Sequence, residues 1–221
     1  MGNIDFGYVV LGMVGLIFSL SVHEFGHAWV SLKFGDDLAY AQGRVTLNPL
    51  AHIDPIGTLL IPALMFVNTT GLGIIGWAKP VPVNPLRWRN KRVANFWVSS
   101  AGIIGNLGIA TVAAIGLRII LYKAEFFRQY EVTNGIATFL DLLFRMNIGL
   151  FIFNLLPIPP LDGGSILSSI FPPFEEVIAS IGQFGFIILL VLVNLPFFRS
   201  FMGGIIAFAY QVAFYGTALG R

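Results

Sequence analysis

The stretch that decides the fold is residues 6–32, FGYVVLGMVGLIFSLSVHEFGHAWVSL. Residues 6–22 carry no charged side chain, and the apolar pattern continues as one helix to Leu32. A helix that crosses a bilayer needs about 20 mostly apolar residues. We therefore expect a first transmembrane helix here, with the polar motif His23-Glu24-Phe25-Gly26-His27 inside it.

Charge is scarce along the whole chain. The 221 residues include 13 Lys or Arg and 11 Asp or Glu, so 11% are charged, whereas a soluble domain averages about 25%. With 56% hydrophobic residues, the chain has too few polar side chains to cover a surface that faces water. This composition excludes an ordinary soluble protein and predicts contact with the lipid bilayer. The basic residues are sparse and are better interpreted as topology signals, so we expect no nucleic-acid partner.

The uncharged runs predict the architecture. After the first helix they cover residues 55–78, 93–117, 146–161, 177–198 and 200–220. We expect an all-α polytopic membrane protein with about five to six transmembrane helices. It forms one membrane-embedded domain over residues 1–221, with a core at 1–170 and additional C-terminal helices at 177–220.

The run at residues 55–78 is interrupted by Asn68 and by three glycines from Gly71 to Gly76, which favours a re-entrant hairpin. If the run turns back, seven basic residues from Lys33 to Arg92 share one face of the membrane, and the positive-inside rule makes that face cytosolic. We also expect residues 42–47 and 80–83 to pair as short β-strands near the active site, on the cytosolic side.

The His23 to His27 motif carries the chemistry. Residues four apart lie on one face of a helix, so both imidazoles can reach a single Zn²⁺, with Glu24 beside the metal as general base and acid. This arrangement is typical of a metal-dependent peptide hydrolase. The alternative is two histidines satisfied by hydrogen bonds in the core, but ionisable groups inside a membrane helix are costly unless they pair or bind something.

A third ligand must come from elsewhere, because catalytic zinc usually takes three protein ligands. The chain has no cysteine, so the ligands are His, Asp or Glu. Asp162 is the best candidate, a lone acid after Pro157, Pro159 and Pro160, which unwind the backbone. The alternative is an interfacial Asp162 that only caps the helix that follows.

These residues carry a family resemblance. The chain resembles the site-2 proteases, intramembrane zinc metalloproteases, in a compact prokaryotic branch without accessory domains. The similarity rests on three segments: His23 to His27, Ala101 to Asn106, and Asn154-x-x-Pro157 to Asp162-Gly163. The resemblance implies that His23, His27 and Asp162 bind one Zn²⁺ per chain and that Glu24 is catalytic. It also implies a prokaryotic inner or plasma membrane, with the active site toward the cytosol.

Three further polar residues are candidates. Asn154 and Asn106 lie in apolar stretches, where an amide can hold a substrate backbone; the alternative is hydrogen bonding between helices. His52 stands beside Asp54 before the re-entrant run, where it could block the metal site as a regulatory ligand, or lie on the surface of a turn.

The function predicted is intramembrane proteolysis, with a membrane protein bearing a transmembrane segment as the substrate. Two alternatives stay open at this point. Broken helices with polar groups also serve a membrane transporter or metal carrier, although a carrier needs no general base. A family member could also bind transmembrane segments without cutting them.

Overall fold

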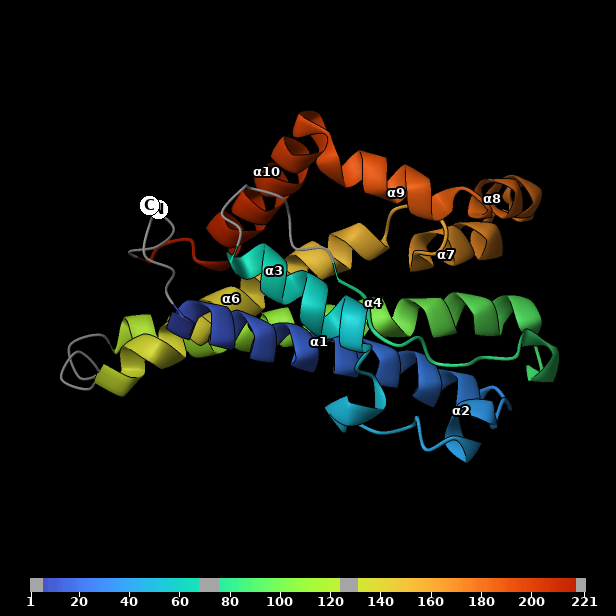
Figure 1. The fold of residues 1–221 in the computed structure, drawn as a ribbon, viewed down its shortest axis with the longest axis horizontal. Coiled ribbons are helices and arrows are strands. Elements are labelled where there is room, and N and C mark those ends of the chain that lie inside the picture. Colours follow the sequence, from blue (N-terminus) through green and yellow to red (C-terminus); the bar gives the residue numbers. More distant parts are fainter. Residues whose placement is uncertain (1–5, 68–75, 124–130, 218–221) are drawn as a thin grey trace.

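The structure is a computed structural model that describes residues 6–67, 76–123 and 131–217. Its core is built from three long helices, α1 (Phe6–Lys33), α4 (Lys91–Tyr122) and α6 (Glu131–Asn154). Figure 1 shows them running side by side along the long axis of the molecule, and α4 contacts both of the others. Each neighbour runs antiparallel to α4, so the C-terminal ends of α1 and α6 meet the start of α4.

Short helices join these three. Between α1 and α4 lie α2 (Leu38–Ala41), a 3₁₀ turn (Pro49–Ala51), a π-helical segment (Pro55–Leu60), α3 (Ile61–Val67) and a 3₁₀ turn (Pro85–Arg87). After α6 come α7 (Asp162–Ile170), a 3₁₀ turn (Pro172–Phe174), α8 (Glu175–Gly182), α9 (Gly185–Asn194) and α10 (Pro196–Ala213). In Figure 1 the helices α8 to α10 form an outer layer beside the core.

The number of spanning helices is lower than the sequence predicts. In the part of the chain that the structure describes, three helices are long and apolar enough to cross a bilayer: α1, α4 and Thr133–Asn154 of α6. The expected five to six are wrong because an uncharged run does not reveal where its helix breaks. The run at 177–198 is divided between α8 and α9, whose axes differ by 80°, and this bent pair raises the count to four at most.

The predicted β-strands are also wrong, because every regular element in the described ranges is a helix. Residues 42–47 and 80–83 do approach each other, but through a side chain. The Arg44 guanidinium donates from Nη2 to the carbonyl oxygens of Lys79 (2.6 Å) and Pro80 (3.1 Å). Pro80 and Pro82 have no backbone N–H to donate, and the N–H of Val81 between them donates to Glu24, so these residues make no strand pairing here.

The two ends of the run at 55–78 lie together. The Trp77 N–H donates to the carbonyl of Gly57 (3.1 Å), and the Thr58 hydroxyl donates to the carbonyl of Trp77 (2.7 Å). The start of this run, in the π-helical segment, and its end at Trp77 are therefore in direct contact. The turn predicted between them, at residues 68–75, lies outside the described residues.

Close contact between α1 and α4 depends on glycine. A Cβ atom added to Gly26 would lie 2.8 Å from the carbonyl oxygen of Ala101, which is backbone and cannot move aside. Small residues at a membrane helix interface let the backbones approach, so dispersion contacts and interhelical hydrogen bonds become possible. Further along, α4, α6 and α10 enclose an apolar cluster with Leu117, Phe144 and Phe214 at its centre.

We expect Gly26→Ala to lower the free energy of unfolding in detergent by about 1–3 kcal/mol, the usual cost of forcing extra atoms into a packed interface. Thermal or denaturant unfolding measures the change. Gly15→Ala on the same helix is the matched control, because its added methyl meets only side chains at 3.4 Å or more. Equal unfolding curves for the two variants would contradict the close contact described here.

Candidate metal centre

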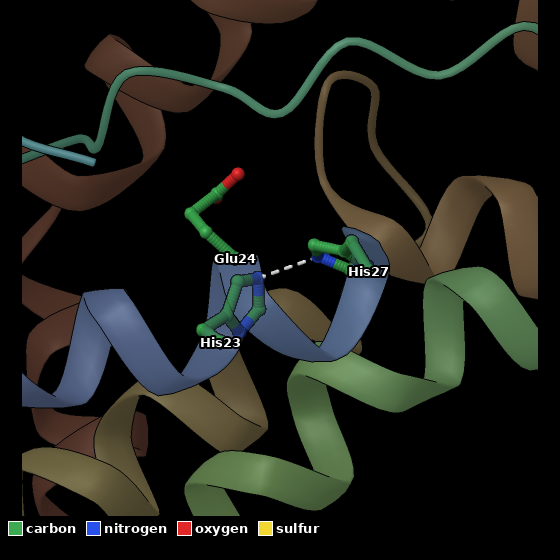
Figure 2. A group of neighbouring side chains, drawn as sticks. All are labelled: His23, Glu24 and His27. Atoms are coloured by element: carbon green, nitrogen blue, oxygen red, sulfur yellow. Dashed lines mark hydrogen bonds between the residues drawn. The ribbon is translucent and has the colours of Figure 1, made fainter. Parts of the chain in front are cut away.

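Helix α1 places three polar side chains together, as Figure 2 shows. His23, Glu24 and His27 each offer a ligand atom, and these atoms lie within 4.8 Å of one another. The two histidines are four residues apart, so they project from one face of the helix. Their Nε2 atoms face each other at 2.9 Å.

Asp162 completes the group from the other half of the chain. Its Oδ2 lies 3.3 Å from the Nε2 of His23 and 3.5 Å from the Nε2 of His27. It is the first residue of α7, and the chain before it folds back so tightly that a Cβ on Gly163 would overlap the carbonyls of Leu155 and Leu156. The unwinding after α6 therefore brings this carboxylate to the histidines.

The donor set fits a tetrahedral zinc ion. With bonds of about 2.0–2.1 Å, ligand atoms around such an ion stand roughly 3.3 Å apart, close to the separations of Asp162 from both histidines. The Oδ2 of Asp162 is buried and has no hydrogen-bond partner, which is costly unless a cation satisfies it. Space is kept beside the rings, because a Cβ on Gly102 would lie 2.6 Å from the Nε2 of His27.

The Nδ1 atom of each ring, on the side away from Asp162, has a hydrogen-bond partner on α4. His27 Nδ1 lies 2.7 Å from the carbonyl oxygen of Val98, which can only accept, so Nδ1–H donates and Nε2 keeps its lone pair. His23 Nδ1 lies 2.7 Å from Oδ1 of Asn106. Partners of this kind orient metal-binding histidines and fix their tautomers.

The Glu24 side chain points toward an extended segment at residues 76–84 (Figure 2). Its Oε2 accepts a hydrogen bond from the N–H of Val81 (2.8 Å). That segment is itself anchored by Arg44 at Lys79 and Pro80. The carboxylate is thus held at a fixed place beside the histidines.

These groups line a cavity of about 750 Å³, within the 300–1,000 Å³ typical of ligand pockets. Its walls come from α1, the extended segment, α4, the end of α6, α7 and α9. Asn154 lies in this wall, and its Nδ2 donates to the carbonyl of Leu150 (2.9 Å). Apolar side chains of α9 cover one side, namely Phe186, Leu189, Leu190 and Val193.

The structure does not bring the other two predicted residues into the cavity. Asn106 is fully buried between the core helices, where it contacts His23 and Asn147. His52 is 1% exposed, and its Nε2 lies 2.9 Å from the carbonyl oxygen of Thr46. In this arrangement His52 supports the turn before residue 55 and is not among the residues that line the cavity.

The sequence reasoning missed several supporting groups. Asn147 and Ser19, both fully buried, accept hydrogen bonds from Nδ2 of Asn106, at the side-chain oxygen of Asn147 (2.9 Å) and at the backbone carbonyl of Ser19 (3.4 Å). Asn147 is a lone amide in an apolar run, the same signal that singled out Asn106 and Asn154, and could have been found by it. The backbone groups of Val81 and Val98 leave no such signal, because every residue has them.

The chain is similar to known metalloproteases. A family model described as Peptidase family M50 matches residues 118–192. YwhC of Bacillus subtilis (strain 168) is 39% identical over 185 residues, which is 83% of this chain and 80% of YwhC. Rip2 of Mycolicibacterium smegmatis is 34% identical over 191 residues, 86% of this chain and 69% of Rip2. Rip2 of Mycobacterium tuberculosis (strain H37Rv) is 29% identical over 208 residues, 94% of this chain and 75% of Rip2.

The names of all three relatives assign them as zinc metalloproteases. A match over 208 of 221 residues leaves 13 unmatched, so it spans both the His23 motif and Asp162. No solved structure gives a significant match. On the extent and identity of these relatives, the chain belongs to peptidase family M50, the site-2 protease family of intramembrane zinc metalloproteases.

Proposed function

We propose that His23, His27 and Asp162 hold the zinc ion of this protease and that Glu24 is its general base and acid. The observation that carries the proposal is the convergence of three ligand atoms from two distant parts of the chain, one of them a buried carboxylate oxygen without a hydrogen bond. The two histidines and the aspartate make the three protein ligands usual in catalytic zinc sites.

A bound zinc ion supplies a Lewis acid that polarises a carbonyl and makes water more acidic. The chain's own groups do the rest. Glu24 accepts a proton from the attacking water and passes it to the leaving amine, because its carboxylate lies one residue from His23 on the same helix. The N–H of Val81 holds one carboxylate oxygen in place, so the other is available for the transfer.

The substrate is a membrane protein, as the family implies. We propose that it enters as a locally unwound transmembrane segment, because a peptide carbonyl inside a helix is already hydrogen-bonded and shielded. The cavity wall offers Asn154 as a polar contact for that backbone and α9 as an apolar contact for its side chains. A transporter or metal carrier does not need a general base beside the metal. Glu24 therefore favours a metalloprotease over the transporter alternative.

The protein is an integral membrane protein with bacterial relatives. We propose that it forms a single membrane domain over residues 1–221 and that its metal centre lies toward the cytosol of a prokaryotic cell. Basic residues support this orientation. Lys33, Lys91 and Arg92 lie at the end of the core where α1 finishes and α4 begins, whereas Arg118 and Lys123 lie at the other end of α4.

Glu24→Gln should abolish cleavage of a model transmembrane substrate while the protein keeps its zinc, because the amide cannot carry the proton. General acid–base catalysis is worth about 10²–10⁴-fold, so activity should fall by at least that factor. Glu175→Gln, the same change at the start of α8, is the control and should cleave normally. Cleavage that survives Glu24→Gln would overturn the assignment. Absence of cleavage by the natural protein would instead indicate a chain that binds segments without cutting.

Gly102→Ala should weaken zinc binding by about tenfold or more, as changes beside metal ligands commonly do. The new methyl would occupy the space beside both imidazoles. Zinc content after dialysis against a weak chelator gives the readout. Gly108→Ala on the same helix is the control, since nothing lies within 4 Å of its added methyl. Equal zinc retention in the two variants would argue against a metal held at His23 and His27.

Orientation can be tested with single cysteines, because the natural chain has none. Leu86 and Tyr122, which are 78% and 88% exposed, lie near opposite ends of α4. A membrane-impermeant maleimide should label Leu86→Cys from the cytosolic side, in inverted vesicles. It should label Tyr122→Cys from the opposite side, in intact cells or right-side-out vesicles. The reverse labelling pattern would place the metal centre toward the outside.

A further inference from the structure

A buried polar network lies at the centre of the three core helices, beyond the candidate metal ligands. Asn106 of α4 and Asn147 of α6 are both completely buried. Asn106 Nδ2 donates to Oδ1 of Asn147 (2.9 Å), and Asn147 Nδ2 donates to Oγ of Ser19 on α1 (2.8 Å). The network therefore joins all three helices and ends at His23.

The two histidines depend on this network differently. His27 faces a backbone carbonyl, which can only accept, so its protonation pattern is decided locally. His23 faces the side-chain amide of Asn106, which has an accepting oxygen at one corner and a donating NH₂ at the other. If that amide turned over, NH₂ would face Nδ1 of His23, and the proton of the ring would move to Nε2, where a metal could not bind.

The orientation of Asn106 is decided by its partners. Asn147 Nδ2 donates to the carbonyl of Leu143 (2.8 Å), a pure acceptor, so the oxygen of Asn147 must point toward Asn106. An oxygen there requires the NH₂ of Asn106 opposite it. The same NH₂ also donates a longer hydrogen bond to the carbonyl of Ser19 (3.4 Å), which requires the same orientation of the Asn106 amide. The oxygen of Asn106 is left facing His23.

The hydrogen bonds of Ser19 also fix the orientation of the Asn147 amide. The Ser19 hydroxyl donates to the carbonyl of Gly15 (2.7 Å), so toward Asn147 it can only accept. Carbonyl groups of α1 and α6 thus fix the direction of each hydrogen bond in the network. Buried networks in which every member is satisfied hold a single arrangement, since any reversal leaves an unpaired group.

We propose that Asn147 is a positioning residue for zinc binding: through Asn106 it holds His23 in the Nδ1–H tautomer and so leaves Nε2 free for the metal. The inference rests on the proposed role of His23 as a ligand. Asn147 lies outside the cavity wall, and its effect reaches the metal through two hydrogen bonds.

The test measures the zinc dissociation constant of purified full-length variants by competition with a chelator, together with thermal unfolding of the zinc-free forms. Asn147→Leu keeps the branched shape but removes the acceptor for Asn106. Its zinc dissociation constant should rise about 10–100-fold, the range for changes to the partners of metal ligands. Asn147→Asp keeps an oxygen toward Asn106 whether or not it is protonated, so its constant should stay within about threefold of the natural protein.

Ser31→Ala is the matched control for the loss of a buried contact. Ser31 is also fully buried on α1. It accepts a hydrogen bond from Nε1 of Trp88 (2.8 Å) and donates one to Asp36 (3.1 Å), and among the described residues these bonds do not reach a candidate metal ligand. The unfolding temperature of this variant should fall while its zinc affinity stays the same. If Asn147→Leu does not purify as a folded protein, Asn147→Ala removes the same acceptor with less bulk.

A rescue variant distinguishes positioning from general packing. In Asn106→Asp combined with Asn147→Leu, a carboxylate faces Nδ1 of His23 and can only accept, so zinc affinity should recover to within about threefold. Failure of that rescue, or equal loss in Asn147→Asp and Asn147→Leu, would overturn the inference. His23→Ala tests the underlying assignment separately. Lost zinc in His23→Ala with natural affinity in Asn147→Leu would refute only the positioning role.

Discussion

Polar side chains in a membrane helix must find partners within the protein, because the hydrocarbon region offers no water. This constraint organises the molecule around His23 and His27. Their outer nitrogens reach α4, at Asn106 and at the carbonyl of Val98, and their inner nitrogens face Asp162. The contact is short enough only because Gly26 and Gly102 carry no side chain at the crossing of α1 and α4. Packing of the core and formation of the site are therefore one event.

The same constraint explains the extended segment at residues 76–84, ahead of α4. Its backbone is extended and rich in proline, so it cannot satisfy itself as a helix does. Side chains supply what the backbone lacks: Arg44 donates to two carbonyls, and Glu24 accepts from the N–H of Val81. At the far end the fully buried Asp36 accepts from the N–H of Asn84 (2.7 Å). The segment is thereby held along its length as one wall of the cavity.

The sequence predicts some of this structure well and some of it poorly. The membrane class and the first span follow from uncharged residues, and the approach of His23 to His27 follows from helix periodicity. That Asp162 meets them depends on chain reversal after α6, which spacing alone does not give; the unwinding prolines and the family resemblance pointed to it. The strands are predicted wrongly because the sequence does not show that side chains take the backbone groups of residues 79–81. Glu24 accepts from the N–H of Val81, and Arg44 donates to two carbonyls. The outer helices were miscounted because breaks such as the one after Gly182 carry no charge.

The long sequence separation of the groups around His23 has a consequence for biosynthesis. Helix α1 is made first and enters the membrane with its histidines and Glu24 unpaired, because Asn106, Asn147 and Asp162 are 83, 124 and 139 residues further along the chain. With Asp162 as the proposed third zinc ligand, the nascent polypeptide cannot assemble its hydrolytic centre until the ribosome has passed this residue. Proteolytic competence thus appears late in translation, after the three core helices are present, and the unfinished chain has no means of cleaving its neighbours at the translocation site.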